Sequence, residues 1–183
     1  MTACIQKVWK AMSILTRDVI LELIQSGQIR IDPFSEEQVG PASVDLHLGN
    51  HFRVFKEIRR PFDVTEGADL DEITEQIHVL DGDSLMLMPG KTCLGITVER
   101  IKLPPNICGW LQGRSRFARL GLVIHATASF IQPGIDNKQV LEITNNGQVP
   151  LNIIPKVALC QLVLEECTGQ AVYNGRFHKQ AIP

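Results

Sequence analysis

Apolar and polar side chains alternate strictly between Ser43 and Leu48, and this is the clearest structural signal in the chain. A period of two places successive side chains on opposite faces of a β-strand, so we expect one face of this segment to be buried. Phe52 and Val54 continue the apolar face. Shorter apolar runs predict further strands at 77–80, 85–88, 92–99, 107–111, 122–125, 139–144, 150–154 and 157–165.

A helical period occurs near the N-terminus, between Thr16 and Ser26. Apolar residues recur there at Val19, Ile20, Leu23 and Ile24. A threonine before the run and Gly27 after it are typical of helix ends. The segment predicts one amphipathic helix, and no other segment predicts a long one.

Turn-forming residues separate the predicted strands. They are Asp81-Gly82-Asp83, Pro89-Gly90, Pro104-Pro105, Pro133-Gly134 and Asn145-Asn146-Gly147. Many short strands with such turns favour a sandwich or barrel of jelly-roll type. We therefore expect a mainly β fold with one N-terminal helix and short helical turns.

Length and composition indicate one domain. The 183 residues are 44% hydrophobic and 21% charged, which is enough for one substantial core. Because Met12 is a second candidate start, we expect residues 1–11 to be an N-terminal extension and 12–183 to be the domain. The sequence has no run of eighteen apolar residues and no signal-peptide core, which predicts a cytoplasmic location. A net charge of −2 gives no general attraction to nucleic acid or membranes.

Cysteines and histidines indicate neither disulfides nor a metal centre. The five cysteines are an odd number, and no two of them are separated by the spacing of a metal site. We expect them to be reduced and buried. The histidines are scattered, and we assign His125 a structural role. The cysteines are Cys4, Cys93, Cys108, Cys160 and Cys167.

The most polar motif runs from Gly113 to Gly121 and places three arginines and a serine between two glycines. A guanidinium group offers a planar set of donors that pairs with phosphate oxygens. The segment therefore fits a phosphorylated ligand. Taken alone, it also fits a solvated basic turn.

Further motifs stand in a fixed order around this segment. They are Pro41 to Gly49, Gly113 to Gly121, His125-Ala126-Thr127-Ala128, Pro133-Gly134 leading to Val140-Leu141-Glu142, and Gln161-Leu162. In this order and spacing, the chain from Met12 onward resembles the dCTP deaminase family of the dUTPase-like superfamily. The resemblance implies a distorted jelly-roll or dUTPase-like β-barrel and a homotrimer with active sites at subunit interfaces.

The resemblance also implies a reaction, the hydrolytic deamination of dCTP to dUTP and ammonia. In this family Mg²⁺ accompanies the triphosphate, and no direct protein ligand to a metal is implied. The His-x-Glu and Pro-Cys-x-x-Cys pattern of zinc-dependent nucleobase deaminases is absent from the sequence, so no zinc is expected.

Catalytic roles follow from the matched positions. The resemblance makes Glu142 the general base that activates water for attack on C4 of cytosine, whereas spacing alone would allow a solvent-facing carboxylate at a strand end. Ser115 and Arg119 match positions at the cytosine end of the site, and Arg114 matches a phosphate-facing position. Ala128 matches the wall that positions the water, although a core alanine is the alternative.

Other substrate-binding positions follow in the same way. A C-terminal tail at about 168–183 would close the site, with Tyr173, Arg176 and Gln180 as counterparts of a family tyrosine, lysine and glutamine. The alternative for this tail is a frayed polar terminus. The remaining implied positions are Arg116, Phe117, Ala118, Gln132, Val140, Leu141 and Gln161.

Four positions depart from the family pattern. Arg116 replaces a second serine, and Gln132 replaces an aspartate that helps pyrophosphate hydrolysis in dUTPases and bifunctional deaminases. Because a glutamine amide cannot act as a base, we do not expect strong dUTPase activity. Asn137 replaces a common glycine and His47 a common arginine, and we expect both in a turn or at a trimer surface.

The sequence therefore predicts a homotrimeric dCTP deaminase, a hydrolase of pyrimidine nucleotide metabolism that supplies dUTP without a catalytic metal. The resemblance suggests dTTP as an inhibitor. Two alternatives stay open. One is a bifunctional enzyme that carries dUTP on to dUMP, and the other is a non-catalytic trimeric sensor that binds deoxynucleotides.

Overall fold

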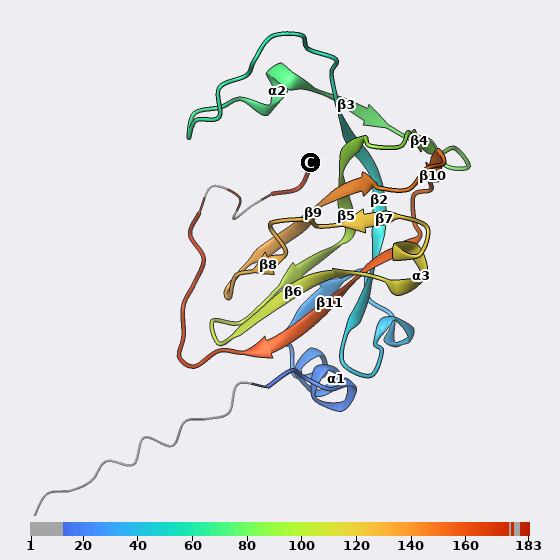
Figure 1. Cartoon of the computed structure of the whole chain (residues 1–183). Coiled ribbons are helices and arrows are strands. Elements are labelled where there is room, and N and C mark those ends of the chain that lie inside the picture. The colour runs from blue at the N-terminus through green and yellow to red at the C-terminus, as the bar shows by residue number, and fades with distance from the viewer. Residues whose placement is uncertain (1–12, 176, 178–179) are drawn as a thin grey trace, which may run out of the picture.

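The computed structural model describes residues 13–175, 177 and 180–183. Most of its regular structure belongs to one strongly curled sheet, with a helix packed near one end (Figure 1). The elements in chain order are α1 (Arg17–Gln25), β1 (Arg30–Asp32), the 3₁₀ turn η1 (Glu36–Gln38), β2 (Val44–Phe55), α2 (Leu70–Ile73), β3 (Thr74–His78), β4 (Leu85–Leu87), β5 (Thr92–Lys102), β6 (Ile107–Gly113), α3 (Ser115–Ala118), β7 (Leu122–Ile124), β8 (Phe130–Ile131), β9 (Asp136–Asn145), β10 (Leu151–Ile153) and β11 (Ala158–Glu166).

The large sheet has the strand order β7-β9-β5-β2-β11-β6-β8, with β1 paired to β5 and β3 paired to β2. Strands β4 and β10 form a separate ribbon. All of these pairs are antiparallel. The expectation of a mainly β, barrel-like fold with one N-terminal helix and short helical turns is confirmed.

The core lies on the inner face of the curled sheet. The alternation predicted in β2 is confirmed, because Val44, Leu46 and Leu48 are fully buried while the residues between them are partly exposed. Strand β9 repeats the pattern with Leu141 and Ile143. Full burial of such a side chain stabilises the fold by about 1.5–3 kcal/mol. The same alternation directs Glu142 and Thr144 of β9 to the outer face.

Some elements differ from the sequence predictions. Strand β1 was missed because its one buried residue, Ile31, stands between the exposed Arg30 and Asp32. The two-residue strand β8 is too short to show a period. Strand β3 begins at Thr74 and ends at His78, rather than spanning 77–80. These strands take their conformation from pairing with long neighbours, which a local pattern does not show.

Helix α1 begins after Thr16, as predicted, and buries Ile20 in the core. The Thr16 hydroxyl donates to Asp18 Oδ1 at 2.5 Å and makes no hydrogen bond to the helix backbone. This bond lowers the pKa of Asp18. Gly27 has a φ of +74° just past the end of the helix, which favours glycine.

A buried carboxylate joins η1, β2 and β5. Glu99 is only 1% exposed and accepts hydrogen bonds from the His47 amide at 2.9 Å and from Gln38 Nε2 at 2.9 Å. His47 Nδ1 lies 2.6 Å from the same carboxylate. His47 thus lies within β2, as the alternation from Ser43 to Leu48 predicts, and its expected place at a trimer surface stays a prediction. A buried carboxylate needs such donors to offset its lost hydration.

The basic segment ends at a turn that requires glycine. Gly121 has a φ of +82°, and a Cβ at this position would lie 2.6 Å from the backbone of Gly147. Both the left-handed conformation and the close approach of two backbones exclude a side chain.

We expect the Gly121→Ala substitution to lower the free energy of unfolding by about 1–3 kcal/mol, because it adds backbone strain and a steric clash. Urea denaturation followed by circular dichroism measures this change. Gly67→Ala is the matched control, since a Cβ at Gly67 meets nothing within 4 Å. It should change the same free energy by less than about 0.5 kcal/mol. Equal effects of the two substitutions would contradict the argument.

Candidate active site

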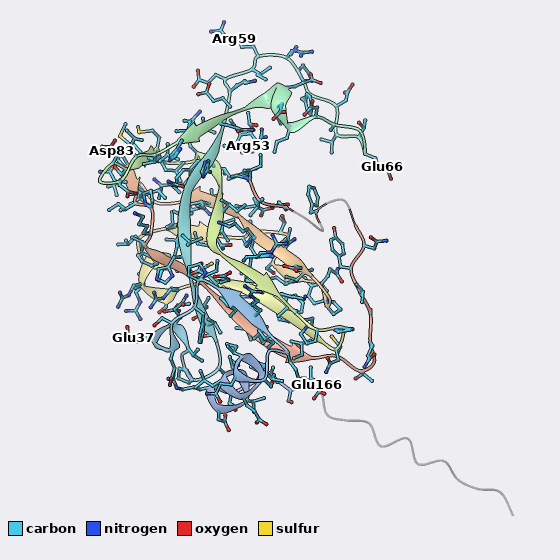
Figure 2. All side chains as sticks on the ribbon, turned by 180° about the vertical axis from the view of Figure 1, so that it is seen from behind. Glu37, Arg53, Arg59, Glu66, Asp83 and Glu166 are labelled. Carbon is cyan, nitrogen blue, oxygen red and sulfur yellow. The ribbon has the colours of Figure 1, made fainter. Side chains whose placement is uncertain are left out.

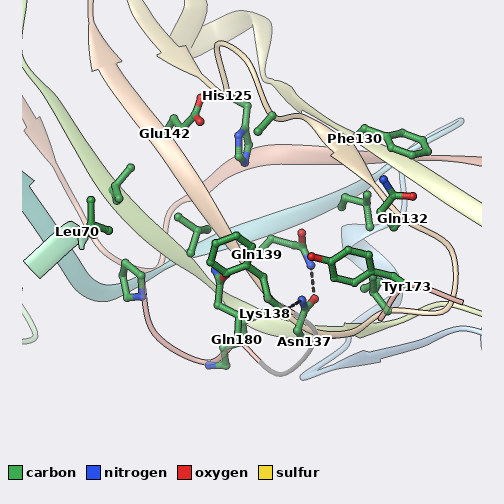
Figure 3. A pocket seen from close by; sticks show the side chains of 17 residues that line it. Leu70, His125, Phe130, Gln132, Asn137, Lys138, Gln139, Glu142, Tyr173 and Gln180 are labelled. Carbon is green, nitrogen blue, oxygen red and sulfur yellow. Dashed lines mark hydrogen bonds between the residues drawn. The ribbon is translucent and has the colours of Figure 1, made fainter. Parts of the chain in front are cut away.

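A cavity of about 450 Å³ lies beside β9 and β8 and under the C-terminal tail (Figure 3). We use "tail" for residues 168–183, of which the structure describes 168–175, 177 and 180–183. The sequence argument assigned six of the lining residues to the site, and the structure places them around this one cavity. They are Glu142, Val140, Ala128, Gln132, Tyr173 and Gln180.

Glu142 owes its position to the pleat of β9. Its neighbours Leu141 and Ile143 are fully buried, so the Glu142 side chain projects from the opposite face, toward the cavity. The core position of Leu141 also means that only its backbone can face a ligand. Glu142 pairs with Leu94 of β5, which lines the cavity as well.

Donors from the loop after β7 hold the Glu142 carboxylate. Its Oε2 accepts from the amides of Ala126 and Thr127 at 3.2 and 3.3 Å, and the Thr127 hydroxyl lies 3.2 Å from both carboxylate oxygens. Charge-assisted hydrogen bonds of this kind stabilise the negative charge and fix the orientation of the group. An oriented carboxylate at a cavity wall can take a proton from a bound water.

His125 lies beside Glu142 in the same wall, although the sequence argument gave it a structural role. Its φ is +54°, and its amide donates to the Glu142 carbonyl oxygen at 2.9 Å. Neither ring nitrogen has a hydrogen-bond partner among the described residues. Burial lowers the pKa of His125, and the negative charge of Glu142 offsets part of this shift. The neutral ring is therefore favoured at neutral pH.

The basic segment, Gly113 to Gly121, lies apart from the cavity of Glu142 on the same chain. Arg114, Ser115 and Arg116 line a separate depression together with Gln161. Among the described residues, none of those that line this depression also lines the cavity of Glu142. Within a single chain, the predicted site residues around Glu142 and those around Arg114 therefore line two different depressions.

Arg114 is tied into the fold at the start of α3. Its guanidinium pairs with the Asp45 carboxylate at 3.0 Å and donates to the Ala158 carbonyl oxygen at 2.8 Å. The other residues of the segment are placed differently. Phe117 packs against the core, whereas Ser115, Arg116, Ala118 and Arg119 are exposed. Arg176, the cation assigned to the tail, lies outside the described residues.

Asn137 is a cavity residue that was not identified from the sequence. It lies in β9 and is 6% exposed, so the expected turn is wrong, whereas the alternative of a trimer surface stays a prediction. Its Nδ2 donates to the Phe177 carbonyl oxygen at 2.8 Å, and its Oδ1 accepts from Gln139 Nε2 at 2.6 Å. All three residues line the cavity. Lys138 and Gln139 are polar residues directly before the apolar pair Val140-Leu141, a signal that could have revealed them.

Leu70 and Phe130 also line the cavity and were missed, because apolar residues carry no chemical signature in a sequence. Phe130 packs against Trp110, with 4.8 Å between the ring centroids and 52° between the ring planes. Aromatic and aliphatic walls are usual in pockets that bind small organic ligands.

Cys93, Cys108 and Cys160 are buried, as expected, and Cys167 is partly exposed. Burial raises the pKa of Cys93 and of Cys108 to about 12 and also raises that of Cys160. These thiols therefore stay protonated and are poor nucleophiles. Cys4 lies outside the described residues.

Among the described residues, no three histidine, cysteine, aspartate or glutamate side chains converge in a way that could hold a metal ion. Within the same part of the chain, no helix is long and apolar enough to cross a membrane.

Comparison with known proteins gives one consistent family. A family model described as dCTP deaminase-like matches residues 14–167. A protein of Actinobacillus pleuropneumoniae named dCTP deaminase is 42% identical over 164 residues, which cover 84% of this chain and 84% of that protein. A protein of Methanobrevibacter smithii named "dCTP deaminase, dUMP-forming" is 36% identical over 181 residues, which cover 94% of this chain and 93% of that protein.

A solved structure has the same fold. The chain is similar to 2'-deoxycytidine 5'-triphosphate deaminase from Agrobacterium tumefaciens, with a TM-score of 0.66 and 22% identity. The match covers 89% of this chain but 50% of the solved chain, so this chain spans about half of that chain's length. At this identity the comparison supports the fold.

The lowered pKa of His125 predicts how stability depends on pH. A histidine that is unfolded takes up a proton near pH 6.5, whereas the folded His125 takes it up only at a lower pH. Stability is therefore present above about pH 6.5 and is lost as the pH falls, by at most about 1.4 kcal/mol per pH unit. Urea denaturation at pH 7.5, 6.5 and 5.5 measures this loss.

The His125→Asn substitution is the matched variant, because asparagine stays neutral and tolerates a positive φ. We expect its free energy of unfolding to fall less steeply between pH 7.5 and 5.5 than that of the unchanged protein. If the free energy of unfolding falls equally steeply with pH in the two proteins, protonation of His125 does not cause the loss of stability.

Proposed function

This chain belongs to the dCTP deaminase-like family and is an enzyme, and we propose that it hydrolyses dCTP to dUTP and ammonia. The observation that carries the proposal is the Glu142 carboxylate, which two amides and a hydroxyl hold at the wall of the cavity of about 450 Å³. The relatives named dCTP deaminase support the choice of substrate. We place the enzyme in the cytoplasm.

Glu142 would act as general base and then as general acid. Its carboxylate takes a proton from water as the water oxygen attacks C4 of cytosine. As the C4=N3 double bond opens, Glu142 passes this proton to N3. The new C4 hydroxyl then gives up its proton through Glu142 to the amino group, which leaves as ammonia, so that C4 keeps the oxygen as a carbonyl and N3 keeps its proton. Proton transfers of this kind normally contribute about 10²–10⁴ to the rate. Because Thr127 and the Ala126 amide fix the carboxylate, it needs little reorientation during the reaction.

We further propose that the complete site forms between protomers of a homotrimer. One protomer would supply Glu142, and its neighbour would supply Ser115 and Arg119 for the base and Arg114 and Arg116 for the phosphates. Within one chain, Arg114, Ser115 and Arg116 line a different depression from the cavity of Glu142, which supports this arrangement. A head-to-tail interface that closes into a ring would repeat the same site three times. We expect Mg²⁺ to enter with the triphosphate and dTTP to compete for the same site.

A bifunctional enzyme that forms dUMP is the second candidate. Relatives named "dCTP deaminase, dUMP-forming" are 36% and 39% identical to this chain, which favours it. Against it, Gln132 lines the cavity where these bifunctional enzymes are expected to carry an aspartate, and an amide cannot accept a proton as a base.

An assay of purified protein with dCTP and Mg²⁺ tests the reaction by following ammonia, dUTP, dUMP and pyrophosphate together. We expect ammonia and dUTP, and we expect Glu142→Gln to lower kcat by at least about 10²-fold because the amide cannot take the proton. Pyrophosphate release is also measured for Gln132→Asp, which restores the carboxylate that bifunctional enzymes are expected to carry, and is compared with that of the unchanged protein.

Production of dUMP and pyrophosphate by the unchanged protein would make it bifunctional. Binding of dCTP without turnover, by both the unchanged protein and Glu142→Gln, would instead indicate a deoxynucleotide sensor and contradict the enzyme assignment.

Mixed trimers test the shared site. Glu142→Gln and Arg119→Ala should each be inactive alone, but protomers of the two kinds can combine an intact Glu142 with an intact Arg119 at one interface. With random assembly, about one quarter of the interfaces regain both groups. We therefore expect about a quarter of the original activity after the two variants are co-expressed. A site within one chain would give no recovery.

A further inference from the structure

The tail lies directly on the sheet where it passes the cavity. The Tyr173 amide donates to the Pro133 carbonyl oxygen at 3.0 Å. A Cβ on Gly134 would lie 2.9 Å from Val172 Cα, so the tail and this turn are in close backbone contact. In Figure 1, residues 168–175 leave the end of β11 at the lower end of the sheet, and the C-terminal end lies below α2.

Strand β9 holds the next part of the tail. The buried Asn137 amide donates to the Phe177 carbonyl oxygen at 2.8 Å. The backbone amide of Lys138 donates to the Gln180 carbonyl oxygen at 3.2 Å. Because Phe177 and Gln180 line the cavity, these bonds hold part of its wall in place.

Arg53 of β2 is the last anchor, and it is buried to an extent that is unusual for a cation. It is 7% exposed, and its Nε donates to the Pro183 backbone oxygen at 2.7 Å. Its Nη1 forms an ion pair with Asp71 of α2 and donates to Thr74 Oγ1 at 3.1 Å. A guanidinium stays charged when it is buried, so its burial is costly unless acceptors replace its hydration.

The partners of Arg53 in the tail and those around α2 belong to different walls of the cavity. Pro183 lines it from the tail, and Leu70, next to Asp71 in α2, lines it from the other side. The Thr74 hydroxyl, which accepts from Arg53, itself donates to the Leu70 carbonyl oxygen at 2.8 Å. One cation therefore bonds to both walls.

We infer that Arg53 is a positioning residue that holds the tail closed over the cavity and fixes the α2 wall in the same arrangement. When the tail leaves, Arg53 Nε loses its acceptor inside the protein. The penalty for an unpaired buried donor corresponds to about a tenfold change in the equilibrium between closed and open tail. The kinetic part of this inference rests on the proposed function, but the closure of the tail does not.

The Arg53→Lys substitution tests the inference, because lysine keeps the charge but cannot reach three acceptors with one planar group. We expect hydrogen exchange of the Tyr173 and Gln180 amides to become about tenfold faster. The KM for dCTP should rise about tenfold while kcat stays within about twofold, since the tail contributes binding and no proton transfer. A merely structural role would lower the melting temperature without this division between KM and kcat.

Two further variants complete the experiment. Asp71 is exposed, so Asp71→Ala removes one partner of Arg53 with little risk to folding, and we expect it to speed tail exchange as well. Arg59→Lys is the control, because Arg59 lies at the outer end of the molecule, far from the inward-lying Arg53 (Figure 2). It should change neither tail exchange nor KM.

Unchanged tail exchange in folded Arg53→Lys and Asp71→Ala proteins overturns the inference. If the tail amides of Arg53→Lys exchange faster but its KM for dCTP is unchanged, Arg53 has no positioning role in the reaction. If the unchanged protein produces no ammonia, the proposed function fails, whereas the exchange measurements still decide whether Arg53 holds the tail.

Discussion

The pairing of β9 with β5 determines both the core and the position of the proposed base. Leu141 lies opposite Gly95 and Glu142 opposite Leu94, so the pleat directs one side chain inward and the next outward. Gly95 permits tight packing here, because a Cβ would lie 2.7 Å from Leu48 Cδ1. A register slip of one residue would exchange the two faces. Hydrophobic packing on the inner face therefore fixes where the carboxylate stands on the outer face.

Local patterns explain what could be predicted from the sequence. The alternation in β2 is visible in neighbouring residues, so this strand was located before the fold was known. The role of Glu142 rested on the family resemblance, because spacing alone also allowed a solvent-facing carboxylate. Strand β1 gives no such signal, because its only buried residue lies between charges. The roles of Asn137 and Arg53 depend on partners 40 and 130 residues away, and no local pattern encodes contacts of that separation. The resemblance to a family supplied the site residues but not the bonds that hold them.

The basic segment combines a structural cation with exposed ones. Arg114 and Asp45 are both about a quarter exposed, and the bond to the Ala158 carbonyl oxygen fixes the guanidinium further. This anchors the start of α3 to β2 and β11. Arg116 and Arg119 are exposed on the helical turn that follows, whose backbone is held by the hydrogen bonds from Ala118 to Arg114 and from Arg119 to Ser115. Cations on a rigid support bind an anion without first losing conformational freedom, which favours affinity.

The successive attachments of the tail have a consequence for how it moves. Closing a flexible loop costs entropy that grows with the number of free residues. The contacts at Pro133, Asn137 and Arg53 divide the tail into short segments, so each contact that forms lowers the entropic cost of the next. We expect the tail to order and to release cooperatively, as a unit. A ligand that orders one end of the cavity would then also order the opposite end.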